Sequence, residues 1–352
     1  MGLENLKILD FRNYVNIKIE SFSDTNLIIG PNGSGKTNLL ESIYTLLRLR
    51  PLRTGGIQEL IRWNENSFYI GGEYDGETLE IGYSPQKKLI KMNHSVVPPK
   101  EIIEKYQVFA FMPEDLLIVS GTPDDRRSFM DHGFSLLDPE YQEILSRYQR
   151  TLRQRNAHLK QNPAQAKIWD PELIDSGSKL IYKRIRWMKE ISGDITRSYS
   201  EYYEDHIELR YLNPFKIEGK IEDSLANALK MSSRLEMEKG YTLAGPHRDN
   251  FEIQSRDHTA KIFASQGQKR MLSLLLKQSL AGAAKRKYKK KPLLLLDDVL
   301  LELDQDRRDR FLSDLIPNYQ TFLAGTSTST FQSVLKEQPV FYISSGTISH
   351  SN

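Results

Sequence analysis

Eight residues near the N-terminus have the types and spacing needed to hold a chain of phosphate groups. They fit Gly-x-x-x-x-Gly-Lys-Ser/Thr and are Gly30, Pro31, Asn32, Gly33, Ser34, Gly35, Lys36 and Thr37. Glycines let such a loop curl its backbone N–H groups toward phosphate oxygens, and the following helix adds its dipole. The pattern predicts an ATP site in which Lys36 reaches the β- and γ-phosphates and Thr37 holds Mg²⁺. The alternative is a chance glycine-rich turn, which a strand before the loop and a helix after it argue against.

A second set of candidate residues follows the apolar run 292–296, which ends in Asp297 and Asp298. Such a run is typical of a central parallel strand buried on both faces, and ligands bind at the carboxyl ends of these strands. We expect Asp297 to bind Mg²⁺ and Asp298 to polarise the attacking water, with Lys36 as the other catalytic residue. A buried strand that merely runs into an acidic turn is the alternative interpretation.

A third segment, 264–270, precedes a predicted helix and contains Ser265, Gly267 and Gln268. A hydroxyl, a bare backbone and a helix N-terminus can together grip an anion. The segment is similar to the signature of ABC-type ATPase heads, where this grip acts in trans on nucleotide held by a second head. Dimerisation would then be linked to ATP. Alone, Ser265 and Gln268 also fit a helix capping box.

The elements that must position these residues follow from the hydrophobic pattern. Residues 3–22 alternate and predict a hairpin of edge strands, 26–29 predict a buried strand, and 38–49 predict an amphipathic helix. Residues 66–97 read as a meander with a turn at Asp75–Gly76.

Farther along the chain, the stretches 124–160 and 172–206 are charged and amphipathic, which predicts long helices. Strand texture returns near Ile207, and the pattern is α/β from Tyr241 to Ile343. We therefore expect an α/β fold: an ABC-ATPase head lobe, meaning a P-loop mixed sheet with helices plus antiparallel strands, and an inserted, mainly helical second lobe. The expected divisions are 1–122 and 241–352 for the two parts of the ATPase lobe and 123–240 for the insert.

Composition narrows the class of protein. The 352 residues carry a net charge of only +3, and 39% are hydrophobic and 27% charged, as in a globular protein. There is no cysteine, which excludes disulfides and thiolate metal sites. The N-terminus has no apolar signal core and no stretch reaches membrane-spanning length, so we expect a cytoplasmic protein without a membrane partner.

The chain resembles the RecF family most closely at three further segments. The first, 111–131, resembles the family block Pro-Glu-Asp-Leu … Gly-x-Pro-x-x-Arg-Arg-x-Phe-x-Asp; the second is 245–249, Gly-Pro-His-Arg-Asp; the third joins 297–299 to Glu302-Leu303-Asp304. Arginines 50 and 53 also match the family. Thr122, Leu301 and Ala324 depart from its pattern.

The resemblance implies a function that composition alone does not indicate. RecF-like proteins bind ATP and DNA, single- and double-stranded and without sequence specificity, and form ATP-dependent homodimers. They act as a clamp at single/double-strand junctions, help to load recombinase with RecO and RecR partners, and support the SOS response. Because Asp298 is shorter than the glutamate of many ABC ATPases, we expect weak, DNA-stimulated hydrolysis. Rival interpretations are a transporter ATPase subunit, a nuclease-associated ATPase, and a clamp that uses ATP mainly to hold its dimer.

Several charged residues have two interpretations each. The densest basic run could contact DNA phosphates or simply form a solvated helix end, and consists of Lys285, Arg286, Lys287, Lys289, Lys290 and Lys291. We expect this run to lie in a loop. Arg126 and Arg127 are either functional or salt-bridged to acids at a helix start. For His247 we favour a hydrogen-bonded histidine in a turn.

Overall fold

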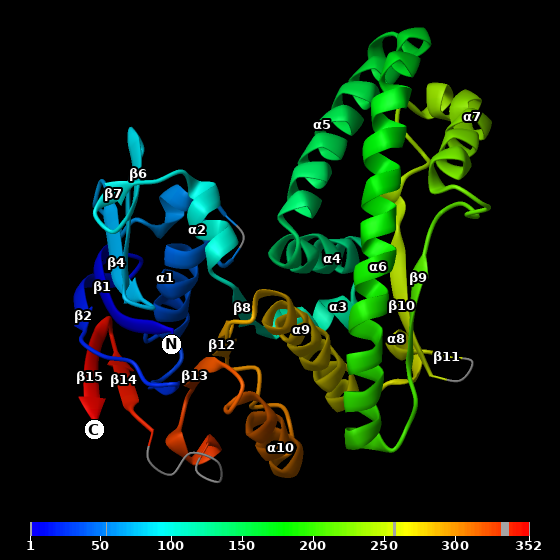
Figure 1. Ribbon diagram of the computed structural model, residues 1–352. Helices are drawn as coiled ribbons and strands as arrows, with labels where there is room; N and C mark the ends of the chain where they lie inside the picture. The colour runs from blue at the N-terminus through cyan, green and yellow to red at the C-terminus, as the bar shows by residue number, and fades with distance from the viewer. Residues whose placement is uncertain (1, 54, 256–257, 332–337, 352) are drawn as a thin grey trace. The chain divides into compact units, whose positions relative to one another are not determined.

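The computed structural model describes residues 2–53, 55–255, 258–331 and 338–351, and every predicted site residue lies within these ranges. The chain forms two compact units (Figure 1). The first consists of Met1–Glu114 together with Ala284–Asn352, and the second of Asp115–Ala283. The described residues include no helix long and apolar enough to cross a membrane.

Two six-stranded sheets form the framework of the first unit in the described part of the chain. The antiparallel sheet has the spatial order β2 (Tyr14–Ile19), β1 (Leu3–Phe11), β4 (Phe68–Tyr74), β5 (Glu77–Ser84), β6 (Lys87–Met92) and β7 (Ser95–Val96). The second sheet has the order β15 (Thr347–Ser351), β14 (Val340–Ser344), β3 (Thr25–Ile29), β13 (Gln320–Gly325), β12 (Leu293–Asp297) and β8 (Val108–Phe111). It is parallel from β14 to β8, and only β15 runs antiparallel.

Helix α1 (Lys36–Arg48) joins the two sheets, because it contacts strands of both. Its buried residues, including Leu39, Leu40 and Ile43, share one hydrophobic cluster with Ile8 of β1 and Phe322 of β13. Burial of large apolar side chains stabilises such a core by about 1.5–3 kcal/mol each. The helix that follows the phosphate loop is therefore held from two sides.

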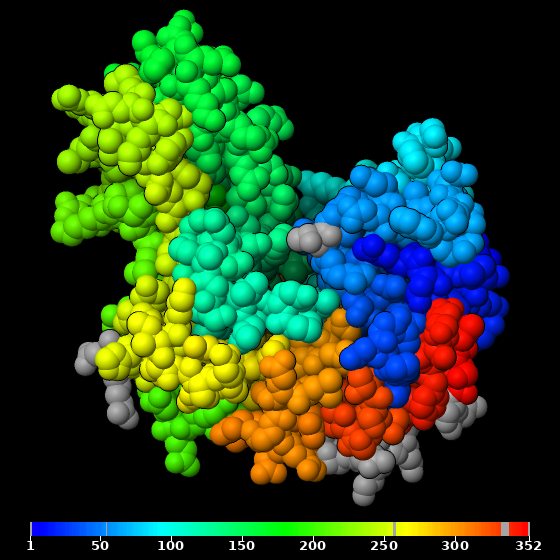
Figure 2. Space-filling model, turned by 180° about the vertical axis from the view of Figure 1, so that it is seen from behind, coloured from blue at the N-terminus to red at the C-terminus, as the bar shows by residue number. Residues whose placement is uncertain are grey.

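In the described part of the first unit, three short helical segments and one longer helix accompany α1. They are η1 (Ile57–Leu60), α2 (Pro99–Lys105), η5 (Thr328–Thr330) and α10 (Gln305–Leu315). The side chain of Asp304 caps α10 by accepting a 3.0 Å hydrogen bond from the Arg307 N–H. Figure 2 shows the red C-terminal strands beside the blue N-terminal segment, as expected from the pairing of β14 with β3.

The second unit combines long helices with a small antiparallel sheet. Its longer helices are α4 (Pro123–Leu137), α5 (Pro139–Gln161), α6 (Asp170–Tyr203), α7 (Ile221–Lys239) and most of α9 (Gln266–Tyr288). Its shorter ones are α3 (Leu117–Ser120), η3 (Pro163–Trp169), η4 (Pro246–Arg248) and α8 (Ala260–Phe263), and η2 (Pro113–Leu116) spans the boundary between the units. The sheet has the order β11 (His258–Thr259), β10 (Asn250–Ser255) and β9 (Glu208–Leu212).

Four sequence-based expectations differ from the structure. Strand β1 is not an edge strand, because β4 pairs with it on the side opposite β2. Helix α7 lies within the expected mainly helical insert, but in the stretch after Ile207 where the pattern predicts strands. The basic run is not wholly in a loop, because α9 continues to Tyr288 and carries Lys285–Lys287 in its last turn.

The fourth difference concerns the predicted boundaries at 123 and 241. The second unit begins earlier, at Asp115, and continues to Ala283. Residues 241–283 belong to it because β10 pairs with β9 over five residue pairs, Asn250↔Leu212 to Gln254↔Glu208. Helix α9 packs closely as well: a Cβ added at Gly133 of α4 would lie 2.5 Å from Leu280 Cδ1.

Candidate nucleotide-binding site

The phosphate-binding loop connects β3 to α1 in the first unit, as predicted. Two of its glycines have backbone angles that other residues rarely adopt: φ is 77° at Gly33 and 121° at Gly35. Gly35 is the N-cap of α1, so the helix begins directly at Lys36. The positive end of the α1 dipole therefore lies at the loop, where it favours an anion.

Two residues, one in the β1–β2 turn and one at the start of β2, support the loop from outside. Asn13 Nδ2 donates a 3.1 Å hydrogen bond to the Ser34 carbonyl, and the Tyr14 hydroxyl donates a 2.9 Å bond to the Gly35 carbonyl. The Gly346 N–H donates to the same Ser34 carbonyl at 3.3 Å. Sequence reasoning missed these contacts, because nothing in the local pattern links residues 13 and 14 to a loop twenty residues away.

Lys36 is almost fully buried and its ammonium faces the loop. Nζ donates to the carbonyls of Gly30 at 3.0 Å and Pro31 at 3.3 Å, and it lies 3.6 Å from Asp298 Oδ2. The charge is thus held at the loop by carbonyl dipoles and one carboxylate. A phosphate oxygen entering the loop would meet this cation already in position.

Thr37 and Asp297 meet directly. The Thr37 hydroxyl donates a 2.6 Å hydrogen bond to Asp297 Oδ2 at the carboxyl end of β12. Burial raises the pKa of Asp297, and the nearby Asp298 raises it further, whereas the hydrogen bond from Thr37 lowers it. A cation near this carboxylate would relieve the cost of keeping it ionised.

Three buried oxygens around the loop have no hydrogen-bond partner among the described residues: Ser34 Oγ, Asp297 Oδ1 and Asp298 Oδ1. Buried polar atoms are usually satisfied, so these are suited to a cation, water or ligand. The described residues contain no group of three or more His, Cys, Asp or Glu arranged for a metal. The set fits Mg²⁺, which typically takes one or two protein ligands and completes its shell with phosphate and water oxygens.

Asp298 has an unusual backbone. Its φ is 53°, in the left-handed region, and its N–H donates a 3.3 Å hydrogen bond to the Ala324 carbonyl. Ala324, one of the departures from the family pattern, is buried in β13, and its carbonyl accepts this hydrogen bond. Leu301, the other departure near this acid, is 40% exposed.

A buried carboxylate next to the loop binds two arginines. Glu41 of α1 is fully buried and accepts from Arg12 Nε and from an Arg53 terminal nitrogen, both at 2.8 Å. Burial alone would raise the pKa of Glu41, but the two guanidinium groups hold it below its ordinary value. Two cations share one carboxylate, which leaves a positive charge beside the phosphate loop.

The signature-like segment lies in the second unit at the start of α9. The Ser265 N–H donates to Gln268 Oε1 at 2.8 Å, and the Gln268 N–H donates to Ser265 Oγ at 3.2 Å. This is the capping box considered above. Ser265 is nevertheless exposed, and a Cβ at Gly267 would meet no atom within 4 Å, so the helix start is accessible to an anion.

The family blocks at 111–131 and 245–249 converge on one buried cation, Arg184 of α6. Its guanidinium donates to Asp249 Oδ2 at 2.9 Å, Asp131 Oδ1 at 2.8 Å and the Pro246 carbonyl at 2.6 Å. The Tyr211 hydroxyl also donates to Asp249. This network lies inside the second unit and gives both blocks a structural role that neither block reveals alone.

The two arginines of the first block have different partners. Arg127 forms the predicted helix-start ion pair with Asp124 and also donates to the Asp249 carbonyl at 2.8 Å. Arg126 instead donates to Asn250 Oδ1 at 2.6 Å. Burial lowers the pKa of Arg126, although nearby acids oppose this.

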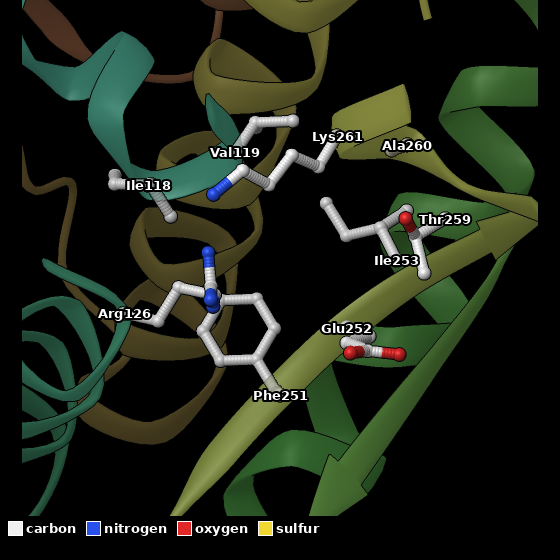
Figure 3. Close-up of a pocket in the computed structure, with 9 residues that line it drawn as sticks. All are labelled: Ile118, Val119, Arg126, Phe251, Glu252, Ile253, Thr259, Ala260 and Lys261. Carbon is white, nitrogen blue, oxygen red and sulfur yellow. The ribbon is translucent and has the colours of Figure 1, made fainter. Parts of the chain in front are cut away.

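Arg126 also lines a pocket of the second unit (Figure 3). Apolar side chains from α3, α8 and β10 form much of its wall, together with Arg126, Glu252, Thr259 and Lys261. Lys261 Nζ donates a 2.9 Å hydrogen bond to the Gly121 carbonyl, so its charge is engaged by the backbone. Arg126 is the one candidate from the sequence analysis among the lining residues, and no residue of the predicted nucleotide or signature sites is among them.

Both ring nitrogens of His247 have hydrogen-bond partners, which agrees with the interpretation of His247 as a hydrogen-bonded histidine in a turn. Its Nδ1 accepts from the Tyr148 hydroxyl at 2.6 Å, and its Nε2 donates to the Thr242 carbonyl at 3.1 Å. Burial lowers the pKa of His247 to about 4, so the ring is neutral near pH 7.

The basic run is split between a helix end and the turn before β12. Lys285 Nζ donates to Asn318 Oδ1 at 2.8 Å, and Lys291 lies 3.6 Å from Asp24. Arg286, Lys287, Lys289 and Lys290 are exposed. Cations at a helix C-terminus are favoured by the helix dipole, so both earlier interpretations of the run stay open.

The fold of the first unit and its phosphate-binding loop define the class of protein. A parallel sheet, a phosphate loop leading from β3 into a central helix, and paired acids after β12, one strand beyond β13, are features of an ABC-ATPase head. Consistent with this, residues 2–347 match the model of the RecF/RecN/SMC N-terminal domain family.

The particular family follows from full-length comparisons, and the chain belongs to the RecF family. It is 34% identical to the DNA replication and repair protein RecF of Ligilactobacillus salivarius, over 100% of this chain and 98% of that one. It is 35% identical to RecF of Natranaerobius thermophilus, over 98% and 97%. The solved structure of the recombination mediator protein RecF with ATP in the RecFOR pathway is similar, with a TM-score of 0.90, 30% identity and coverage of 100% and 98%. A more distant Smc head, at 16% identity and a TM-score of 0.57 over 100% and 98%, shares the fold.

Proposed function

We propose that this protein binds ATP with Mg²⁺ and acts on DNA in replication and recombinational repair. One observation supports the nucleotide site most strongly. The Thr37 hydroxyl is hydrogen-bonded to Asp297, and beside this pair Lys36 Nζ lies 3.6 Å from Asp298 Oδ2. Relatives with 34–35% identity are named for DNA replication and repair, and one similar solved structure is named for its ATP complex.

Each residue of the site has a separate role in binding the nucleotide. The N–H groups of residues 30–35 and the α1 N-terminus bind the phosphates, and Lys36 neutralises the β- and γ-phosphate charge. Thr37 and Asp297 hold the Mg²⁺, which would supply charge stabilisation for the transferring phosphoryl group. Asn13 and Tyr14 keep the loop in shape through its carbonyls.

Asp298 is the residue that activates water for hydrolysis. Its left-handed backbone turns the side chain to the site, where it faces Lys36. An aspartate reaches less far than a glutamate, so we propose that hydrolysis is slow and that DNA stimulates it. Slow hydrolysis would keep the ATP-bound state long-lived.

ATP binding is coupled to formation of a homodimer in this proposal. The exposed N-terminus of α9, with Ser265, Gly267 and Gln268, grips the γ-phosphate held by a second copy. The capping box is compatible with this role, since it orients the helix N-terminus while leaving it open. Nucleotide would then be part of the interface, so ATP stabilises the dimer by mass action.

The partners of the dimer are DNA and mediator proteins of the RecO and RecR type. We propose that the clamp acts at single/double-strand junctions in the cytoplasm, contacts DNA without base-specific readout, and supports recombinase loading and SOS induction. The exposed members of the basic run 285–291 are candidates for phosphate contacts.

The test is the mass of the protein in solution, measured by light scattering without nucleotide, with ATP, and with ATP plus duplex DNA. We expect ATP to convert a monomer to a dimer in the wild type. Lys36→Arg and Ser265→Arg should abolish the dimer for different reasons, the first through lost nucleotide binding and the second by blocking the helix start. Asp298→Asn should prolong it. A protein that stays monomeric under all conditions would rule out the trans grip and leave Ser265 with only its capping role.

A further inference from the structure

Trp63, in the loop between η1 and β4 of the first unit, is 87% exposed. Tryptophan is usually among the more buried residues, because its indole has a large apolar surface. Its side chain contributes little to the core at this exposure. Its aromatic faces are therefore available to a ligand.

The loop that carries Trp63 is held in a fixed shape. The Arg62 N–H donates to the Asp10 carbonyl at 2.8 Å, and Arg62 Nε donates to Asp10 Oδ1 at 2.9 Å. The Glu65 N–H donates to the Arg62 carbonyl at 3.0 Å, and the Arg62 guanidinium binds the Glu65 carboxylate at 2.7 Å. Because its neighbours on both sides are fixed, Trp63 would lose little backbone entropy on binding a ligand.

The surroundings of the indole favour a flat π ligand over a protein surface. Trp63 is preceded by Arg62 and followed by Asn64, Glu65 and Asn66, so the chain adds no apolar neighbour to it. A protein interface normally needs a contiguous apolar patch with several anchors. An exposed aromatic side chain flanked in sequence by polar residues is suited to single-stranded nucleic acid, since every base offers a π-face.

Charge near the loop is balanced, because Arg62 is shared by two carboxylates whereas two arginines share a third. Arg12 donates to the Glu59 carbonyl of η1 at 2.9 Å, and it shares the buried Glu41 with Arg53. The one excess positive charge at Glu41 is offset by the excess carboxylate at Arg62. A strand would therefore be held here through a base and not through its phosphates.

We propose that Trp63 stacks on an unpaired base of single-stranded DNA. This inference rests on the DNA partner of the proposed function and adds to it a contact with the base, as distinct from the phosphates. It involves no sequence preference, because stacking tolerates every base. Base pairs inside a duplex are stacked on both faces, so the contact acts on unpaired bases.

The experiment measures binding of fluorescent strands by anisotropy for the wild type, Trp63→Ala and Trp63→Phe. The probes are an oligothymidine, a strand of the same length with abasic sites throughout, and a blunt duplex. Trp63→Ala should weaken oligothymidine binding about tenfold, in line with one stacked base, while Trp63→Phe retains most of the affinity. Binding of the abasic strand and the duplex should not change. Tyr182→Ala, which removes a 59% exposed aromatic from α6, is the matched control and should bind like the wild type.

Intrinsic fluorescence provides a second measurement on the unlabelled protein. Trp187 is 2% exposed and the Trp169 indole donates to His158, so oligothymidine should quench the emission of Trp63 most strongly. The quenching should disappear in Trp63→Phe. Quenching by ATP alone, with none added by oligothymidine, would overturn the inference and place the indole at the nucleotide.

Other outcomes separate this inference from the proposed function. If the wild type binds no single strand, the DNA partner itself fails and the stacking with it. Equal affinities of wild type and Trp63→Ala for oligothymidine would overturn only the stacking. An equal loss on the abasic strand would also overturn it, as would loss of the ATP-dependent dimer in Trp63→Ala, which would make Trp63 a protein contact.

Discussion

Thr37 donates a 2.6 Å hydrogen bond to Asp297 across 260 residues of sequence. The reason is the strand order, since β3 and β12 lie on either side of β13 and all three run parallel. Their carboxyl ends therefore meet at one edge of the sheet, where the phosphate loop and the paired acids follow.

We expect Thr37 to act on the nucleotide through the metal. Thr37→Ala should lower nucleotide affinity at least tenfold in the presence of Mg²⁺, because a hydroxyl that can bind the metal is removed. Thr37→Ser should retain the affinity. Calorimetric titration with and without EDTA checks this, and an equal loss in EDTA would show that Thr37 acts on the loop and not on the metal.

Replacement of Asp298 should separate binding from hydrolysis. Asp298→Asn keeps the shape of the side chain but removes its basicity, so single-turnover hydrolysis should fall by about 10²–10⁴-fold. Nucleotide binding should persist, since Lys36 keeps its two loop carbonyls at 3.0 and 3.3 Å. Unchanged hydrolysis in this variant would assign the general base to another group.

Two glycines of the phosphate loop provide a matched pair. At Gly35, φ is 121° and an added Cβ would lie 2.7 Å from Asn13 Nδ2, so Gly35→Ala should distort the loop and abolish ATP binding. At Gly33, φ is 77° but the added Cβ meets no atom within 4 Å, so Gly33→Ala should incur only the backbone cost of about 1–3 kcal/mol. Nucleotide titration and thermal unfolding of both variants test this order, which the reverse result would contradict.

Arg184 should be among the most sensitive positions of the second unit. Arg184→Met leaves Asp249 buried without its cation, which should cost about 3–5 kcal/mol of unfolding free energy. Arg186→Met, two residues away on the exposed side of α6, is the control and should change stability little. Urea unfolding measures both, and similar losses in the two variants would argue against the buried network as the cause.

We expect the free energy of unfolding to depend on pH through His247. Burial lowers the pKa of His247 in the folded protein to about 4, below its ordinary value of 6.5, so the unfolded chain takes up the proton first as pH falls. Its stabilising contribution is present above pH 6.5 and is lost between about pH 6.5 and 4. Between pH 7 and 5 the wild type should lose roughly 2 kcal/mol that His247→Gln does not lose. Parallel unfolding curves of the two proteins at both pH values would contradict this.

The sequence by itself determined the elements whose signals are local. The phosphate loop, the helix after it and the apolar strand before Asp297 all follow from spacing and periodicity, because neighbours in the chain create them. The capping box at Ser265 and Gln268 is local in the same sense. Full-length family comparisons support the interpretation drawn from these segments.

Only the tertiary structure decided which distant residues meet. Asn13 and Tyr14 support the loop, and Glu41 binds two arginines, through contacts that no periodicity encodes. The family blocks share Arg184 because α6 lies between them in the second unit, and β10 joins that unit by pairing with β9. Such contacts depend on how strands pair and how helices pack, which is set by burial over the whole chain and not by neighbours in the sequence.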